Sequence, residues 1–303
     1  MKLSKTLANE NDLIEVLIDG YPGGHDGFVF ETDSNLKIWT SSNKGQQIVF
    51  PGGGIQSELL ELDANGNLTV FVEWVSAHHG TSDLRLVDEA SGFVMDTLTF
   101  HTFRSVVIAL GGLDPVPSVP TDPNHGLFLI ADQIYQEGYD VHKYDEDNVS
   151  SGFIPGPMYP AGSGVPFDEV AGAVNNRFVS DVSIIGYSQG GGSTYNLSAY
   201  LSERRVAGEV NPFDLVFTTY LDAVADDGPF AEGRLPLNTQ WHLNLYQQID
   251  DVLDGTPTPG GNENIDVEVS PLFPFDEISH TDIDHQPSVM EWVLMRFRQR
   301  VIQ

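Results

Sequence analysis

The first hundred residues carry the pattern of short β-strands separated by turns. Apolar residues recur in short runs, and the first pair of runs flanks Ala64-Asn65-Gly66-Asn67. Asn-Gly is the strongest short-range signal for a hairpin. We expect strands in two pairs, 58–62 with 68–74 and 84–87 with 93–100. Strands of this length and spacing are typical of a small sandwich, so we predict a β-rich, sandwich-like N-terminal domain over residues 1–103.

From about residue 104 the pattern changes to alternating strands and helices. Residues 106–110 form a continuous apolar run, which is typical of a strand buried on both faces. Leu127, Ile130, Ala131 and Ile134 recur at helical spacing and predict a helix that stops near Gly138. The remaining pattern predicts strands over 139–144, 215–220, 241–246 and 265–269, a helix over 167–178, and a last helix near Ser288 with Glu291 completing a capping box. We therefore predict an α/β domain over 104–303, with a mostly parallel sheet flanked by helices.

Charge is the strongest compositional signal. The chain of 303 residues has 44 acidic and 14 basic side chains and a net charge of −30. Such a charge argues against nucleic acid and against anionic membrane surfaces as partners, and uncharged substrates fit better. No apolar run approaches a membrane span, and residues 1–16 lack a signal-peptide core. We expect a soluble protein; the pattern leaves secreted and cytoplasmic locations open, and the oligomeric state as well.

The chain contains no cysteine, which excludes thiol catalysis, disulfides and thiolate metal sites. Two segments, 63–67 and 145–148, gather oxygen ligands that Ca²⁺ could use. Neither segment completes a calcium loop with a distant bidentate glutamate. We expect no cofactor and no catalytic metal.

The most informative motif lies near the middle of the chain. The apolar run 182–185 leads into Gly186-Tyr187-Ser188-Gln189-Gly190, and a helix is expected from about Ser193 to Val206. A Gly-x-Ser-x-Gly motif between a strand and a helix is typical of a nucleophile elbow, in which a tight turn exposes one hydroxyl group. Glycines give the strained turn room, and the helix directs its positive end toward Ser188. A glycine-rich structural turn is the alternative.

This motif resembles the nucleophile elbow of the α/β-hydrolase superfamily of serine esterases and lipases. The pentapeptide itself is similar to that of cutinases. Cutinases are compact, disulfide-bonded single domains, whereas this chain has no cysteine and a long N-terminal extension. The resemblance implies an α/β-hydrolase fold, Ser188 as nucleophile, and the chain order nucleophile, acid, histidine.

The resemblance places the base in the loop before the final helix. Residues 279–285 contain two histidines, His280 and His285. We favour His280 because it comes first after the strand, and because its His-x-x-Ile-Asp context resembles the base loop of bacterial lipase-like hydrolases. His285 is the alternative.

Three aspartates compete for the role of the acid. Asp222 ends an apolar strand and resembles the acid of pancreatic-type lipases, whereas Asp250 and Asp251 follow the next strand, the commoner location. A carboxylate in an apolar run is costly unless it is hydrogen-bonded. We therefore favour Asp222, with Asp250 and Asp251 as alternatives.

The oxyanion hole and the substrate pocket are assigned to two loops. By the same resemblance, the backbone N–H of Gln189 supplies one oxyanion donor, and that of Gly112 or Leu113 supplies the other. Residues 151–164 are rich in glycine and proline yet carry Phe153, Met158 and Tyr159. These apolar side chains either border an acyl pocket or cover the edge of the sheet.

Together these features predict a serine carboxylic ester hydrolase that forms an acyl-enzyme with uncharged esters, of small molecules, lipids or polyesters. Two alternatives remain open. A metal-dependent hydrolase would use His280, Asp282, Asp284 and His285, which are spaced like the ligands of a binuclear loop. A non-catalytic binding protein on a hydrolase scaffold would instead use its N-terminal part for recognition.

Overall fold

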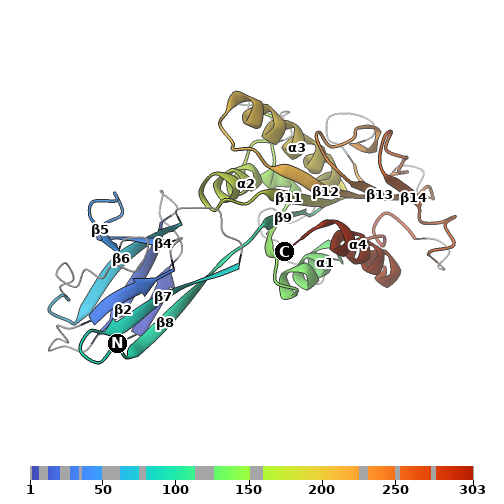
Figure 1. Ribbon diagram of the computed structural model, residues 1–303. Coiled ribbons are helices and arrows are strands. Elements are labelled where there is room, and N and C mark those ends of the chain that lie inside the picture. The colour runs from blue at the N-terminus through green and yellow to red at the C-terminus, as the bar shows by residue number, and fades with distance from the viewer. Residues whose placement is uncertain are drawn as a thin grey trace. The chain divides into compact units, whose positions relative to one another are not determined.

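The chain divides into two compact units in the computed structural model (Figure 1). One unit contains residues 1–103 with 176–178, and the other contains 104–175 with 179–303. The structure describes residues 2–6, 13–20, 28–33, 36–49, 62–74, 80–112, 126–150, 160–224, 231–249, 253–273 and 278–302.

The first unit is built from two antiparallel sheets. The five-stranded sheet has the order β1-β2-β6-β4-β5, and the three-stranded sheet has the order β3-β7-β8. The strands are β1 (Lys2–Thr6), β2 (Ile14–Asp19), β3 (Phe28–Thr32), β4 (Leu36–Trp39), β5 (Gln47–Val49), β6 (Asn67–Trp74), β7 (Gly80–Asp88) and β8 (Val94–Thr102). The predicted strand over 58–62 lies outside the described residues, except for Leu62, which is not in a strand.

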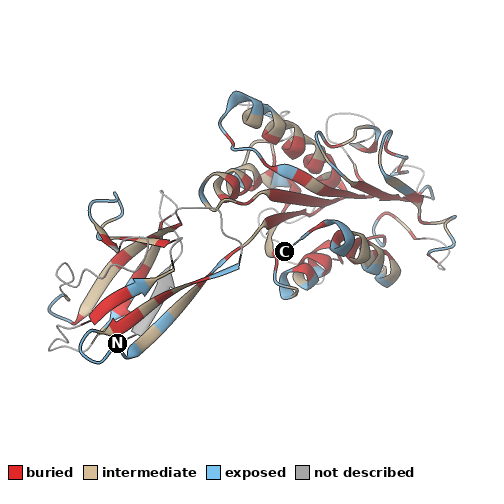
Figure 2. Ribbon diagram, in the orientation of Figure 1, coloured by how far each residue is buried: buried red, intermediate tan, exposed pale blue. Residues whose placement is uncertain are grey.

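The two sheets of this unit share one apolar core. Along β6, Val70, Val72 and Trp74 are buried, while the residues between them are partly exposed (Figure 2). This period of two turns one face of the sheet inward. Phe30 of the smaller sheet and Phe100 of β8 belong to the same buried cluster. Antiparallel β-structure in the first hundred residues is therefore confirmed.

The second unit contains a six-stranded sheet with all strands parallel, in the order β10-β9-β11-β12-β13-β14. The strands are β9 (Ser105–Leu110), β10 (Asp140–Tyr144), β11 (Asp181–Tyr187), β12 (Asp214–Leu221), β13 (His242–Tyr246) and β14 (Glu263–Asp266). The helices are α1 (Gly126–Gln136), α2 (Val165–Asn176), α3 (Gln189–Ala207) and α4 (Pro287–Arg300), with short 3₁₀ turns η2 (Glu146–Asn148) and η3 (Ala231–Gly233). The predicted parallel sheet flanked by helices is confirmed.

The central strands are apolar throughout because helices cover both faces of the sheet. Every residue of β9 and β11 is buried. On β9, Val107 and Ala109 pack in the core with α1 and α4, whereas Val106 and Ile108 pack in the core with α2 and α3 (Figure 1). Since the strands are parallel, their carboxyl ends meet at one edge, which is where open α/β sheets place their sites.

One predicted helix start and one predicted capping box are wrong. Helix α3 begins at Gln189, directly after Ser188, and not near Ser193. Helix α4 begins at Pro287, and its N-cap Gln286 makes no side-chain capping bond, so Ser288 and Glu291 form no capping box. Proline is favoured at the first position of a helix because its missing N–H has no partner there in any case.

Among the residues that the structure describes, no helix is long and apolar enough to cross a bilayer.

Candidate active site

Ser188 lies in the tight turn between β11 and α3. Its backbone has φ 53° and ψ −124°, in a region that residues with a Cβ rarely adopt. The turn needs glycine on either side: a Cβ at Gly186 would lie 2.3 Å from the carbonyl oxygen of Gly190, and one at Gly190 would lie 2.1 Å from that of Leu110. The local sequence thus allows the strained turn that the motif predicts.

The backbone around Ser188 is bonded to the turn that follows β12. The N–H of Ser188 donates to the carbonyl of Leu221 at 3.0 Å, and the N–H of Val224 donates to the carbonyl of Ser188 at 2.8 Å. Asp222 lies between Leu221 and Val224 in the chain and also has a positive φ, of 47°. The two strained residues are therefore held by the same pair of backbone hydrogen bonds.

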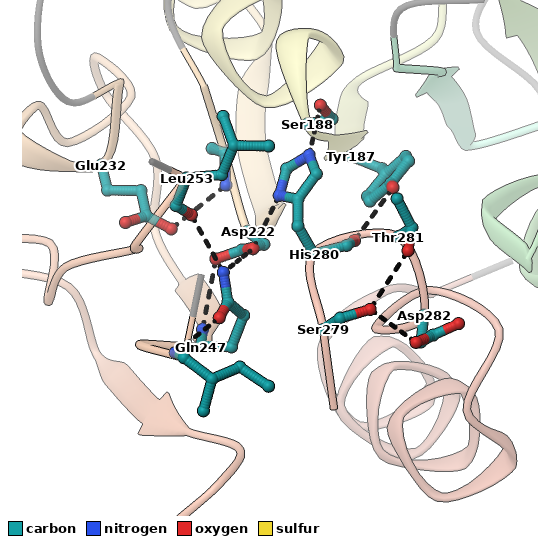
Figure 3. A network of polar contacts seen from close by, with 12 residues as sticks. Tyr187, Ser188, Asp222, Glu232, Gln247, Leu253, Ser279, His280, Thr281 and Asp282 are labelled. Carbon is teal, nitrogen blue, oxygen red and sulfur yellow. Dashed lines mark hydrogen bonds and ion pairs between the residues drawn. The ribbon is translucent and has the colours of Figure 1, made fainter. Parts of the chain in front are cut away.

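The side chains of Ser188, His280 and Asp222 form a continuous chain of hydrogen bonds (Figure 3). Ser188 Oγ lies 2.8 Å from His280 Nε2, and His280 Nδ1 lies 2.7 Å from Asp222 Oδ2. All three residues are buried, with exposed fractions of 8%, 6% and 1%. Because the carboxylate can only accept, Nδ1 carries the proton, and Nε2 is free to accept the proton of the serine hydroxyl.

Tyr187 holds His280 in place from the other side. Its hydroxyl donates to the carbonyl of His280 at 3.0 Å, and the two rings stack with their centres 5.5 Å apart. Burial, reinforced by the negative charges of Asp284 and Asp222, raises the pKa of the Tyr187 hydroxyl, which therefore stays protonated as a donor. This role of Tyr187 was not predicted from the sequence, although Tyr187 stands next to the predicted nucleophile.

Gln247 binds the carboxylate of Asp222 at both oxygens. Its backbone N–H donates to Oδ1 at 3.2 Å, and its side-chain amide donates to Oδ2 at 3.0 Å. The amide also donates to the carbonyl of Leu253 at 2.9 Å and accepts the N–H of Ile249 at 2.8 Å (Figure 3). These donors offset the cost of burying a negative charge. Gln247 could not be identified from the sequence, because its only signal is a polar residue directly after the buried strand β13.

The two alternative acids, Asp250 and Asp251, lie outside the described residues. The same holds for Leu113 and for the predicted pocket residues Phe153, Met158 and Tyr159.

The backbone at Gly112 closely approaches Ser188. A Cβ at this position would lie 2.8 Å from Ser188 Cβ and 3.0 Å from two ring carbons of Tyr187. Gln189 is the first residue of α3, and the first N–H groups of a helix have no acceptor within it. Two of the three predicted oxyanion residues thus border Ser188.

The other members of the predicted metal cluster have different partners. His285 Nδ1 lies 2.7 Å from Asp284 Oδ1, and the other oxygen of Asp284 accepts the N–H of Leu127 at 3.0 Å at the start of α1. Asp282 accepts from the hydroxyl of Ser279. His285 is therefore paired with Asp284, whereas His280 is paired with Ser188. In the part of the chain that the structure describes, no three His, Asp or Glu side chains are arranged to hold a metal ion.

The two oxygen-rich segments considered for calcium serve as turns. Asp63 Oδ1 accepts the N–H groups of Asn65 and Asn67, each at 2.8 Å. Asp145 caps the 3₁₀ turn η2 by accepting the N–H of Glu146.

Burial also shifts the pKa values of three acidic or basic side chains that do not contact Ser188, those of Glu146, Glu232 and His242. Burial raises the pKa of Glu146 to about 9, with a further contribution from its hydrogen bond to Asp145. Burial raises the pKa of Glu232 to about 8 and lowers that of His242 to about 3. All three are therefore uncharged near neutral pH.

No family model matches the chain, and no curated protein matches its sequence. Among solved structures, it has a likeness to the cell-surface chitinase ChiW from Paenibacillus sp. str. FPU-7, with 9% identity and a TM-score of 0.20, over 80% of this chain and 26% of ChiW. A likeness to a calcium-binding mutant of Bacteroides uniformis beta-glucuronidase 2 has 10% identity and a TM-score of 0.25, over 81% of this chain and 36% of that one. The chain thus spans about a quarter to a third of these proteins, and at such TM-scores the likenesses carry no argument about fold or function.

Proposed function

We propose that the chain is a serine carboxylic ester hydrolase with an α/β-hydrolase fold. One observation carries the proposal: Ser188 sits in a strained turn between a strand and a helix, with its hydroxyl 2.8 Å from an imidazole that is held by a buried carboxylate 2.7 Å away. A serine hydroxyl needs such a base within hydrogen-bond reach to act as a nucleophile.

The topology supports the same proposal. Ser188 follows β11, Asp222 follows β12, and His280 comes after the last strand, β14, and before the last helix, α4. This is the order nucleophile, acid, histidine that the resemblance to the superfamily implies. All three residues lie beyond the carboxyl ends of parallel strands, so the sheet brings them to one edge.

The geometry supports an acyl-enzyme mechanism. Ser188 Oγ attacks the ester carbonyl while His280 Nε2 takes its proton, and His280 then gives the proton to the leaving alcohol. Asp222 keeps the imidazole in the required tautomer and stabilises the imidazolium. The N–H of Gln189, with that of Gly112 or Leu113, would hold the developing oxyanion. Water then attacks the acyl-enzyme by the same steps and releases the acid.

An uncharged ester is the substrate class that we propose, whether small-molecule, lipid or polyester. The net charge of −30 repels anionic substrates over a long range and favours neutral ones.

The test combines covalent labelling with hydrolysis. A fluorophosphonate should label Ser188, and a series of p-nitrophenyl esters from acetate to palmitate should be hydrolysed with no loss in EDTA. Ser188→Ala should abolish both signals. Hydrolysis that survives Ser188→Ala but is lost in EDTA would instead support the metal-dependent alternative. A folded chain with neither labelling nor hydrolysis would favour a binding protein.

A further inference from the structure

A second carboxyl group, that of Glu232, lies buried next to Asp222. Glu232 belongs to the 3₁₀ turn η3 and is 1% exposed. The mechanism proposed above gives it no role. A buried carboxyl group is costly, so a defined set of partners is expected around it.

The partners of Glu232, which lies near Asp222 in Figure 3, come from two different loops. One oxygen accepts the N–H of Ala223 at 3.1 Å, and Ala223 directly follows Asp222. The other oxygen accepts the N–H of Thr256, in the loop after β13. A single side chain thus joins the turn that carries Asp222 to the loop beside it.

That loop leads back to Asp222 through Gln247. The N–H of Gly255 donates to the carbonyl of Gln247 at 2.7 Å. Gln247 in turn donates to both oxygens of Asp222. The contacts of Glu232, Gly255 and Gln247 therefore close a ring of polar contacts around Asp222.

Gly255 allows the two carboxyl groups to approach each other. A Cβ at this position would lie 2.6 Å from Asp222 Oδ1 and 2.9 Å from Glu232 Oε2. Both oxygens therefore converge on one point of the backbone, and no side chain larger than hydrogen fits between them.

We propose that Glu232 is a positioning residue, which fixes the turn of Asp222 and thereby aims the Asp222 carboxylate at His280. The role in catalysis rests on the proposed function, whereas the effect on the bond between His280 and Asp222 does not. Glu232 acts through Asp222 and touches neither Ser188 nor His280 among its described contacts.

The charges around Glu232 make its role sensitive to pH. Burial, and to a smaller extent the charge of Asp222, raise the pKa of Glu232 to about 8, although the N–H of Thr256 acts in the opposite direction. Burial, with a smaller effect of the charge of Glu232, also raises the pKa of Tyr220 and of Tyr246, so both phenols stay neutral. Asp222 then carries the only negative charge of the pair until the pH rises past about 8, where Glu232 ionises beside it.

The test compares Glu232→Gln with a matched control, Glu263→Gln. The glutamine amide keeps the shape of Glu232, but its NH₂ group faces the backbone N–H of either Ala223 or Thr256 and cannot accept from it. Glu263 lies on the edge strand β14, away from Ser188, and pairs with Arg296 of helix α4. With a fluorophosphonate, we expect the maximal inactivation rate to fall about tenfold in Glu232→Gln, with half-saturation unchanged and the control like wild type. An unchanged maximal rate in a folded Glu232→Gln protein overturns the catalytic part of the proposal.

A spectroscopic arm separates this proposal from the proposed function. The low-field proton resonance of His280 Nδ1–H reports its bond to Asp222 whether or not the protein is a hydrolase. We expect this resonance to shift or broaden in Glu232→Gln and not in Glu263→Gln. If the wild-type protein is not labelled while the resonance responds, the hydrolase proposal fails and the positioning role stands; if labelling succeeds and the resonance is unmoved, the positioning role fails.

The unmodified chain supplies a test that needs no folded variant. Its low-field resonance should respond to an ionisation near pH 8, that of Glu232. Glu232→Asp, whose shorter side chain reaches only one of the two N–H groups, should give an intermediate inactivation rate. A folded Glu232→Asp protein that is inactivated as fast as the wild type overturns the proposal, whereas a wild-type titration without an ionisation near pH 8 overturns only the raised pKa of Glu232.

Discussion

Replacing Asp222 with asparagine tests how the imidazole is oriented. Three N–H groups point at the carboxylate: His280 Nδ1 at 2.7 Å, the Gln247 amide at 3.0 Å and the Gln247 backbone at 3.2 Å. An amide offers one acceptor oxygen in place of two, and the backbone N–H of Gln247 cannot turn away. The introduced oxygen therefore stays with that N–H, and the introduced NH₂ group faces His280 Nδ1.

The imidazole then has to change its tautomer. Its proton moves to Nε2, which donates to Ser188 Oγ and can no longer accept the serine proton. In a serine protease, the equivalent exchange lowers kcat about 10⁴-fold. We expect kcat to fall about 10³- to 10⁴-fold here, which corresponds to about 4–5.5 kcal/mol of transition-state stabilisation.

The assay measures kcat and KM with a p-nitrophenyl ester, together with the rate of fluorophosphonate labelling. Asp250→Asn and Asp251→Asn are the matched controls, because these residues are the alternative acids. We expect both controls to retain at least about a third of the wild-type kcat. The reasoning is refuted if Asp222→Asn stays within about tenfold of wild type while folded, or if either control loses as much activity.

Two further predictions follow from single contacts, and a third from the buried imidazole of His242. Tyr187→Phe removes the hydrogen bond to the His280 carbonyl but keeps the stacked ring, so kcat should fall about fivefold with KM unchanged; steady-state kinetics with no change in kcat would show that this bond does not hold the base. Gly112→Ala places a Cβ 2.8 Å from Ser188 Cβ, so ester hydrolysis should fall at least about 100-fold, and near-normal activity would contradict the close approach. The pKa of His242 is 6.5 in the unfolded chain, and burial lowers it to about 3 in the folded chain. As the pH drops from 6.5 to 3, the unfolded chain takes up this proton before the folded chain does. The free energy of unfolding should therefore fall over this range, by at most about 1.4 kcal/mol per pH unit. Urea unfolding between pH 7 and 4 should show a shallower dependence for His242→Gln than for wild type, and equal slopes would count against the buried neutral imidazole.

Most strands of the second unit could be predicted because their signal is local, but the strand expected at 265–269 is misplaced, since β14 spans Glu263–Asp266 and residues 267–269 form a turn. The apolar runs that become β9 and β11 are buried on both faces, and such runs have few other uses in a protein of this size. The start of α3 could not be predicted in the same way. Three successive glycines after Ser188 read as a loop, yet they are helical. A Cβ at Gly191 would lie 2.2 Å from that of Ala223, so tertiary packing overrides the poor helix propensity of glycine.

In the candidate site, too, residues with a local sequence signal could be predicted and residues without one could not. Ser188 is marked by its own motif, and the choice of His280 over His285 matches the distances. Asp222 could be favoured but not chosen by pattern alone, since its contact with His280 spans 58 positions of the chain. Gln247 and Glu232 carry no motif at all. Their importance comes from loops that meet only in the folded chain.

The backbone hydrogen bonds between Ser188 and the turn after β12 have a mechanical consequence. These bonds extend the pairing of β11 with β12 beyond the strand ends. A motion of one strand relative to the other should therefore move Ser188 and Asp222 together. His280 lies on a separate segment, which is joined to β11 by the hydrogen bond from the Tyr187 hydroxyl and by the contact of His280 with Ser188. The segment that carries His280 should therefore open at a lower temperature than the sheet, and any hydrolysis that depends on Ser188 should be lost before the sheet unfolds, since loops open at lower cost than central strands.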